Sequence, residues 1–95
     1  MDDAEARARF EDAFARWQRG WSEAASLSEI DAAPARAEIL ALGPRAVPLL
    51  LDELARKPSL GPLTLLVELT GEDPAYGEET VKGAARKWLA WGGRP

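Results

Sequence analysis

The residues best suited to chemistry are four carboxylates that surround Tyr76. They are Glu72, Asp73, Glu78 and Glu79, in a segment that also contains two glycines and a proline. Such carboxylates could serve as a general acid and base, or could bind a hard cation. Their spacing matches no calcium-binding loop, and acidic residues at the start of a helix stabilise it in any case. We therefore expect a solvated acidic loop, and a carboxylate-dependent enzyme is the weakest of the alternatives.

Other catalytic machinery is limited by composition, since the chain has no histidine and no cysteine. This removes Ser-His and Cys-His nucleophiles, imidazole bases and the usual zinc sites. Neither of the common phosphate-binding glycine motifs occurs. We predict a protein that is not an enzyme, with no catalytic residue, no metal, no cofactor and no small-molecule ligand.

The length of 95 residues predicts one domain over residues 1–95. Hydrophobic residues make up 46% of the chain and charged residues 29%, which argues against disorder. No secretory signal is recognisable, and no apolar run approaches the roughly 18 residues of a membrane span. We predict a cytoplasmic location and no membrane partner.

Nucleic-acid binding is the first alternative function. Affinity for nucleic acid depends largely on Lys and Arg, whereas the net charge here is -4. No aromatic residues interleave with the basic ones, as binding of single strands would require. A basic patch would need the helices to align seven residues: Arg36, Arg45, Arg56, Lys57, Lys82, Arg86 and Lys87.

Hydrophobic periodicity predicts an all-α fold of about five helices. Phe10, Phe14, Trp17 and Trp21 are spaced four, three and four apart and form one stripe of a helix over residues 3–19. No segment alternates between apolar and polar residues, so we predict no sheet. The further helices are expected over residues 34–42, 44–57, 60–69 and 78–92.

The segments between these helices carry boundary signals. Ser28 and Asp31 form a weak capping-box pattern ahead of Pro34, which suits the first turn of a helix. Gly43 is a typical helix stop, and Pro44 directly after it begins the next helix. The apolar run around these two residues is therefore predicted to be two short helices that meet at a corner.

Residues 42–54, LGPRAVPLLLDEL, resemble the LG-x-x-AVP-x-LL-x-x-L core of HEAT-like repeats. The segments LTGEDP (residues 69–74) and WLAWG (residues 88–92) are also similar to those of short bacterial proteins of a HEAT-like type. This resemblance extends over roughly residues 14–92. It implies two antiparallel helical hairpins capped by the N-terminal helix, and an interaction scaffold or adaptor. An antitoxin-like partner of a neighbouring gene product is one such role.

Four tryptophans in so short a chain indicate either a rich core or a binding surface. Trp17 and Trp88 share apolar stripes and are expected in the core. Trp21 and Trp91 lie beside glycines at helix ends, and aromatic side chains are enriched in interface hot spots. Together with Tyr76, they are our candidate protein-binding residues. We predict non-catalytic recognition of another protein, or of a second copy of this chain.

Overall fold

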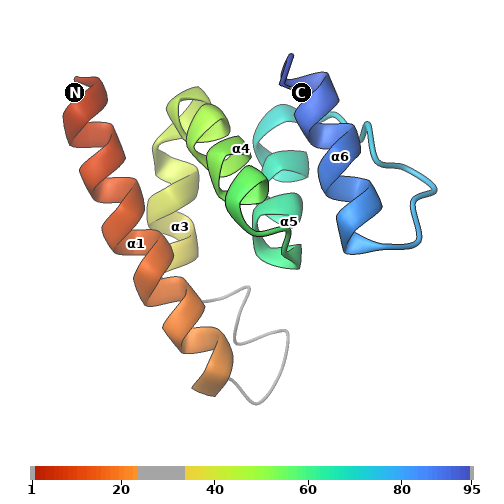
Figure 1. Cartoon of the computed structure of the whole chain (residues 1–95). Helices are drawn as coiled ribbons and strands as arrows, with labels where there is room; N and C mark the ends of the chain where they lie inside the picture. Colours follow the sequence, from red (N-terminus) through yellow and green to blue (C-terminus); the bar gives the residue numbers. More distant parts are fainter. Residues whose placement is uncertain (1, 24–33, 95) are drawn as a thin grey trace. The chain divides into compact units, whose positions relative to one another are not determined.

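The computed structural model describes residues 2–23 and 34–94 (Figure 1). Within these ranges the chain forms five α-helices and one short 3-10 helix, with no strand. The predicted all-α fold of about five helices is confirmed. The chain divides into two compact units, Met1–Ala46 and Val47–Pro95, and each is described below by itself.

The first unit contains helices α1 (Asp3–Glu23) and α3 (Pro34–Ala41), which pack together and run in opposite directions (Figure 1). Phe10, Phe14 and Trp17 of the predicted apolar stripe of α1 are buried, and the rings of Phe10 and Phe14 stack with centroids 5.3 Å apart. The buried residues of this stripe are Ala6, Phe10, Ala13, Phe14 and Trp17.

Two boundaries of the first unit bear on the predictions. Helix α1 continues past Gly20 to Glu23, because a helical glycine costs only about 1 kcal/mol relative to alanine and does not by itself end a helix. Helix α3 begins at Pro34, as predicted. The capping pattern predicted at Ser28 and Asp31 lies outside the described residues.

Helix α3 ends just before the Gly43-Pro44 pair, as this pair predicts. Gly43 has a φ of 62°, in the left-handed region that glycine adopts without strain. Pro44 lies within a 3-10 helix, η1 (Gly43–Arg45), so the following α-helix begins at Ala46 and not at Pro44. No continuous helix passes through Pro44. The predicted hairpin of residues 34–42 with 44–57 joins the two units and stays a prediction.

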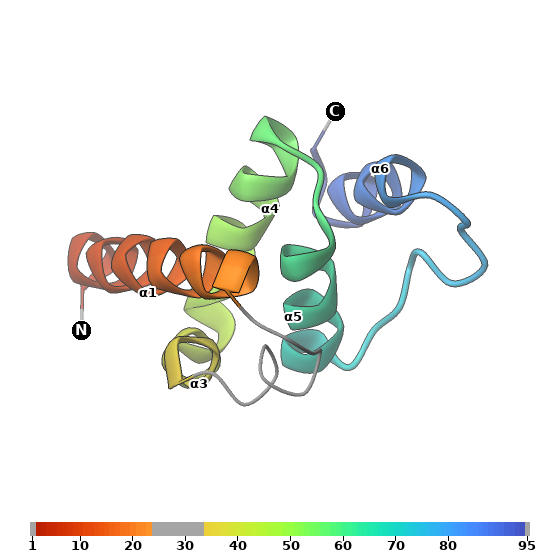
Figure 2. The same cartoon turned by 90° about the horizontal axis from the view of Figure 1, so that it is seen from below.

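The second unit contains helices α4 (Ala46–Arg56), α5 (Leu60–Thr70) and α6 (Val81–Trp91). Figure 1 and Figure 2 both show α4 and α5 running in opposite directions. Helix α5 packs on α6, but Figure 1 shows these two helices running in the same general direction. The last two helices therefore differ from the antiparallel pair that we expected. The intervening loop makes this possible: ten extended residues span up to about 33 Å, whereas an eleven-residue helix is only about 16 Å long.

The start of α6 also differs from the prediction. Glu78 and Glu79 precede the helix, because Thr80 has an extended backbone and acts as its N-cap. The Thr80 Oγ1 accepts a hydrogen bond of 3.0 Å from the N–H of Gly83, which satisfies one of the free donors of the first turn. A β-carbon on Gly83 would lie 2.9 Å from the Glu78 carboxylate and from Thr80 Oγ1. A side chain at residue 83 would therefore collide with the capping segment.

No helix in the described ranges has the length and apolar character needed to cross a membrane.

Candidate protein-binding surface

The loop of residues 71–80 holds Tyr76 in an ordered, exposed position. The N–H of Tyr76 donates to the Asp73 carbonyl at 3.1 Å, and the N–H of Glu78 donates to the Ala75 carbonyl at 2.9 Å. Gly77 permits this sequence of turns with a φ of 89°. The Tyr76 side chain is 88% exposed, so the loop presents an aromatic ring to solvent.

The four carboxylates near Tyr76 are all exposed. Among the described residues, no group of three or more acidic side chains is arranged to hold a metal ion. In this surrounding the carboxylates give the loop negative charge. Glu78 also has a structural role. Its carboxylate lies over the first turn of α6, where its negative charge interacts favourably with the positive end of the helix dipole.

Trp91, the last residue of α6, is the second exposed aromatic residue. Trp88 is only 1% exposed, as predicted for a core residue, whereas Trp91 is 43% exposed. The two rings meet edge to face, with centroids 5.1 Å apart and an interplanar angle of 72°, which is a preferred geometry for an aromatic pair. The buried ring therefore supports the exposed one and limits its motion.

The backbone after Trp91 is also held in place. Gly93 has a φ of 76°, and its N–H donates to the Ala90 carbonyl at 3.1 Å. The N–H of Arg94 donates to the Leu89 carbonyl at 2.8 Å. These bonds form a Schellman motif, in which a left-handed glycine closes the C-terminus of a helix.

The Schellman motif aims Arg94 at helix α4. Its guanidinium forms an ion pair with the Asp52 carboxylate and donates a 3.2 Å hydrogen bond to the Pro48 carbonyl. A β-carbon on Gly92 would lie 2.6 Å from a methyl group of Leu51, so α6 approaches α4 closely here. The helix end that carries Trp91 is thus fixed by glycine conformation, side-chain packing and an ion pair.

All the exposed large hydrophobic residues of the described chain lie in the second unit. They are Leu60, Val67, Tyr76, Val81 and Trp91. Tyr76 belongs to the loop that enters α6 and Trp91 ends that helix, so the structure does not join them in one site. Trp21, the third candidate, lies in the last turn of α1, and its side chain is outside the described residues.

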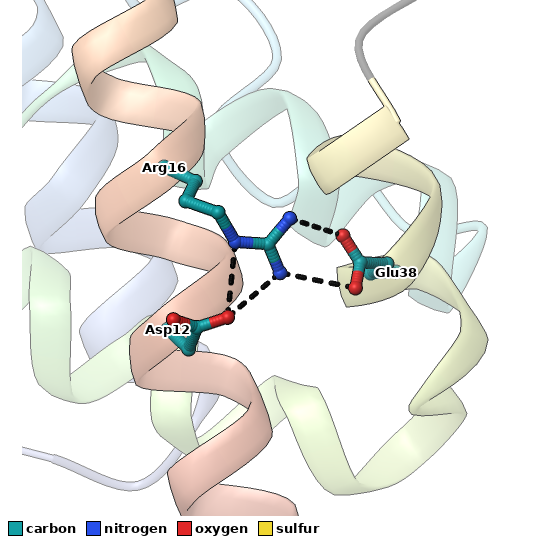
Figure 3. Close-up of polar contacts among 3 residues, drawn as sticks. All are labelled: Asp12, Arg16 and Glu38. Atoms are coloured by element: carbon teal, nitrogen blue, oxygen red, sulfur yellow. Dashed lines mark hydrogen bonds and ion pairs between the residues drawn. The ribbon is translucent and has the colours of Figure 1, made fainter.

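The structure adds one polar cluster that the sequence did not reveal (Figure 3). Arg16 of α1 donates to both carboxylate oxygens of Glu38 on α3, at 2.6 and 3.0 Å. Its Nε also donates to Asp12 at 2.9 Å. Only the Asp12–Arg16 spacing of four residues was a signal in the sequence, because Glu38 joins the cluster when α1 and α3 pack.

The Arg16 cluster borders a surface pocket of about 330 Å³. The hydrogen bond from Arg16 lowers the pKa of Glu38 below its ordinary value, and the bonds that Arg16 donates to Glu38 and Asp12 raise the pKa of Arg16. Glu38 is therefore ionised at neutral pH and is no proton donor there. The guanidinium of Arg16 already donates hydrogen bonds to two carboxylates. The arrangement is that of a clamp between α1 and α3. The pocket residues are Arg9, Asp12, Arg16, Glu38, Ala41 and Leu42.

Comparisons with known proteins found no match for this chain, whether among protein families, curated proteins or solved structures. The resemblance to HEAT-like repeats therefore stays a prediction.

Proposed function

We propose that this protein is a non-catalytic interaction module that binds another protein, or a second copy of itself, through its second unit. The observation that carries the proposal is the exposed ring of Trp91, held edge to face on the buried ring of Trp88. Tryptophan is enriched among the residues that dominate binding energy at interfaces. A ring that is already oriented loses little further conformational freedom when a partner binds.

The fixed end of α6 supports the proposal. The left-handed Gly93 and the ion pair of Arg94 with Asp52 hold the backbone that directly follows Trp91. An exposed aromatic residue on a frayed terminus would lack this support. The proposed scaffold or adaptor role agrees with the resemblance of residues 42–54 to HEAT-like repeats, and an antitoxin-like pairing would be one form of it.

The proposal is tested by photo-crosslinking in the native cells. A photoreactive phenylalanine derivative replaces Trp91 in one variant and Gln18, an exposed residue of α1, in a control variant. We expect a discrete crosslinked species from position 91 that position 18 does not yield. Its mass distinguishes a dimer of this chain from a complex with another protein.

The identified complex is then measured with Trp91→Ala and Gln18→Ala. We expect Trp91→Ala to weaken binding by about tenfold or more, as for an interface hot spot, and Gln18→Ala to leave it unchanged. The proposal fails if positions 91 and 18 give the same crosslinks, or if Trp91→Ala binds as tightly as the parent.

A further inference from the structure

Helix α6 exposes a face on which every charge is positive. The helix contains Lys82, Arg86 and Lys87 but no acidic residue, and all three basic side chains are exposed. Lys87 and Trp91 are four residues apart, so they are neighbours on the helix surface. We name this surface the α6 face and define it by the exposed residues Lys82, Arg86, Lys87, Ala90 and Trp91.

The basic residues of the α6 face are not neutralised within the described chain. The ion pairs of the described residues use other cations, and none of them involves Lys82, Arg86 or Lys87. Arg94, the next cation along the chain, is engaged with Asp52. The three positive charges of the α6 face are therefore directed to solvent, and Lys87 lies beside the exposed ring of Trp91.

We propose that the α6 face binds an acidic segment of a partner protein, with one apolar side chain of that segment packed on Trp91. This inference rests on the proposed function and adds the chemistry of the partner. Carboxylates on the partner complement Lys82, Arg86 and Lys87, and such complementarity increases the association rate and excludes basic competitors. Trp91 supplies the apolar contact that holds the segment in one position.

The surroundings of the α6 face favour a short acidic segment over a nucleic acid. Affinity for a nucleic acid grows with the number of phosphates neutralised, and the helix offers three free cations. The loop immediately before it carries four exposed carboxylates, Glu72, Asp73, Glu78 and Glu79. A long polyanion that continued past Lys82 in the first turn of α6 would meet this negative charge, whereas a short segment can end at Lys82.

The inference is tested with a displayed library of random 12-residue peptides, selected against the full chain. We expect the selected peptides to be enriched in Asp and Glu around one large apolar residue. In fluorescence anisotropy, binding of a selected peptide should weaken about tenfold or more in Arg86→Glu/Lys87→Glu and as the salt concentration rises. Trp91→Ala should weaken binding to a similar degree at every salt concentration.

The matched control is Arg19→Glu/Lys57→Glu, which reverses two exposed charges outside α6 and should change peptide binding by less than about twofold. Circular dichroism checks the fold of each variant. Should Arg86→Glu/Lys87→Glu lose helicity, Arg86→Gln/Lys87→Gln provides the same test without reversed charge.

The inference is overturned if the selected peptides are not enriched in acidic residues. It is also overturned if they bind Arg86→Glu/Lys87→Glu and Arg86→Gln/Lys87→Gln as tightly as the parent. If Trp91→Ala still weakens their binding, the proposed function survives that failure. If Trp91→Ala also has no effect on them, or if no peptide is selected above background, the inference fails and the crosslinking experiment alone decides the proposed function. A 20-nucleotide single strand that binds more tightly than the peptides at 150 mM salt, and loses binding in Arg86→Glu/Lys87→Glu, overturns it in favour of nucleic acid.

Discussion

The two units of this chain differ in the large apolar side chains that their described residues expose. In the first unit, the described part of α1 and α3 buries its aromatic stripe and joins the two helices outside the core with the Arg16–Glu38 clamp. In the second unit, the buried core includes Leu50, Leu54 and Trp88. However, this unit leaves large apolar side chains exposed, two of them aromatic.

The difference distinguishes the residues that stabilise the fold from those that are available to a partner. Exposed ion pairs such as the clamp contribute little to stability, so both units depend on buried apolar area. An exposed tryptophan contributes less to folding than a buried one, and its ring is available to a partner. The comparison therefore assigns the stabilising role in α6 to Trp88, and the exposure of Trp91 suits the binding role that we propose for it.

The largest expected effect is that of Trp88→Ala. Removing a buried tryptophan costs about 3–5 kcal/mol of unfolding free energy, because it leaves a cavity. Trp91→Ala removes an exposed ring and an aromatic pair, at a cost of about 1 kcal/mol. Urea denaturation of the two variants beside the parent measures both values. Equal losses for the two substitutions would break the assignment of separate roles.

The next prediction compares the substitution of one glycine in each unit by alanine. Gly93→Ala forces a side chain into the left-handed region and should destabilise the protein by about 1–2 kcal/mol. Gly20→Ala lies in right-handed helix, and a β-carbon there meets no atom within 4 Å. It should stabilise the protein by about 1 kcal/mol, the difference in helix propensity.

Thermal denaturation followed at 222 nm measures both glycine variants, and the expected shifts have opposite signs. A stabilising Gly93→Ala would mean that the Schellman motif does not fix the end of α6. The support claimed for Trp91 would then be lost, although its exposure would be unchanged.

The features predicted correctly from the sequence depend on neighbours along the chain. The stripe of Phe10, Phe14 and Trp17 repeats with the helical period, and Trp88 lies on the corresponding stripe of α6, so both helices and their buried faces were recognisable. Gly43 and Pro44 act through their own backbone preferences, which is why the helix boundary there was also predictable.

The features that were missed depend on contacts between distant residues or on competition between local signals. Glu38 pairs with Arg16 across 22 positions, and no sequence periodicity indicates such a pair. At the start of α6, acidic residues and a threonine are both acceptable N-terminal signals. The Thr80–Gly83 hydrogen bond decided the boundary. The direction of α6 relative to α5 depends on the path of the loop, which composition does not specify.

The smallest expected effect concerns the clamp itself. The hydrogen bond from Arg16 lowers the pKa of Glu38 from its ordinary value of 4.5. A carboxyl group whose pKa is lower in the folded state stabilises that state above its unfolded pKa, and the contribution is lost as the pH falls through the folded value. Glu38→Gln should therefore lower the melting temperature slightly at pH 7, and the difference from the parent should disappear below pH 4.5.

The control is Glu11→Gln. Glu11 is an exposed residue of α1 without an ion pair among the described residues, so this variant should melt at the same temperature as the parent. A difference for Glu38→Gln that is unchanged at acidic pH would show that the side chain acts through packing, and the clamp would then belong with the apolar contacts of the first unit.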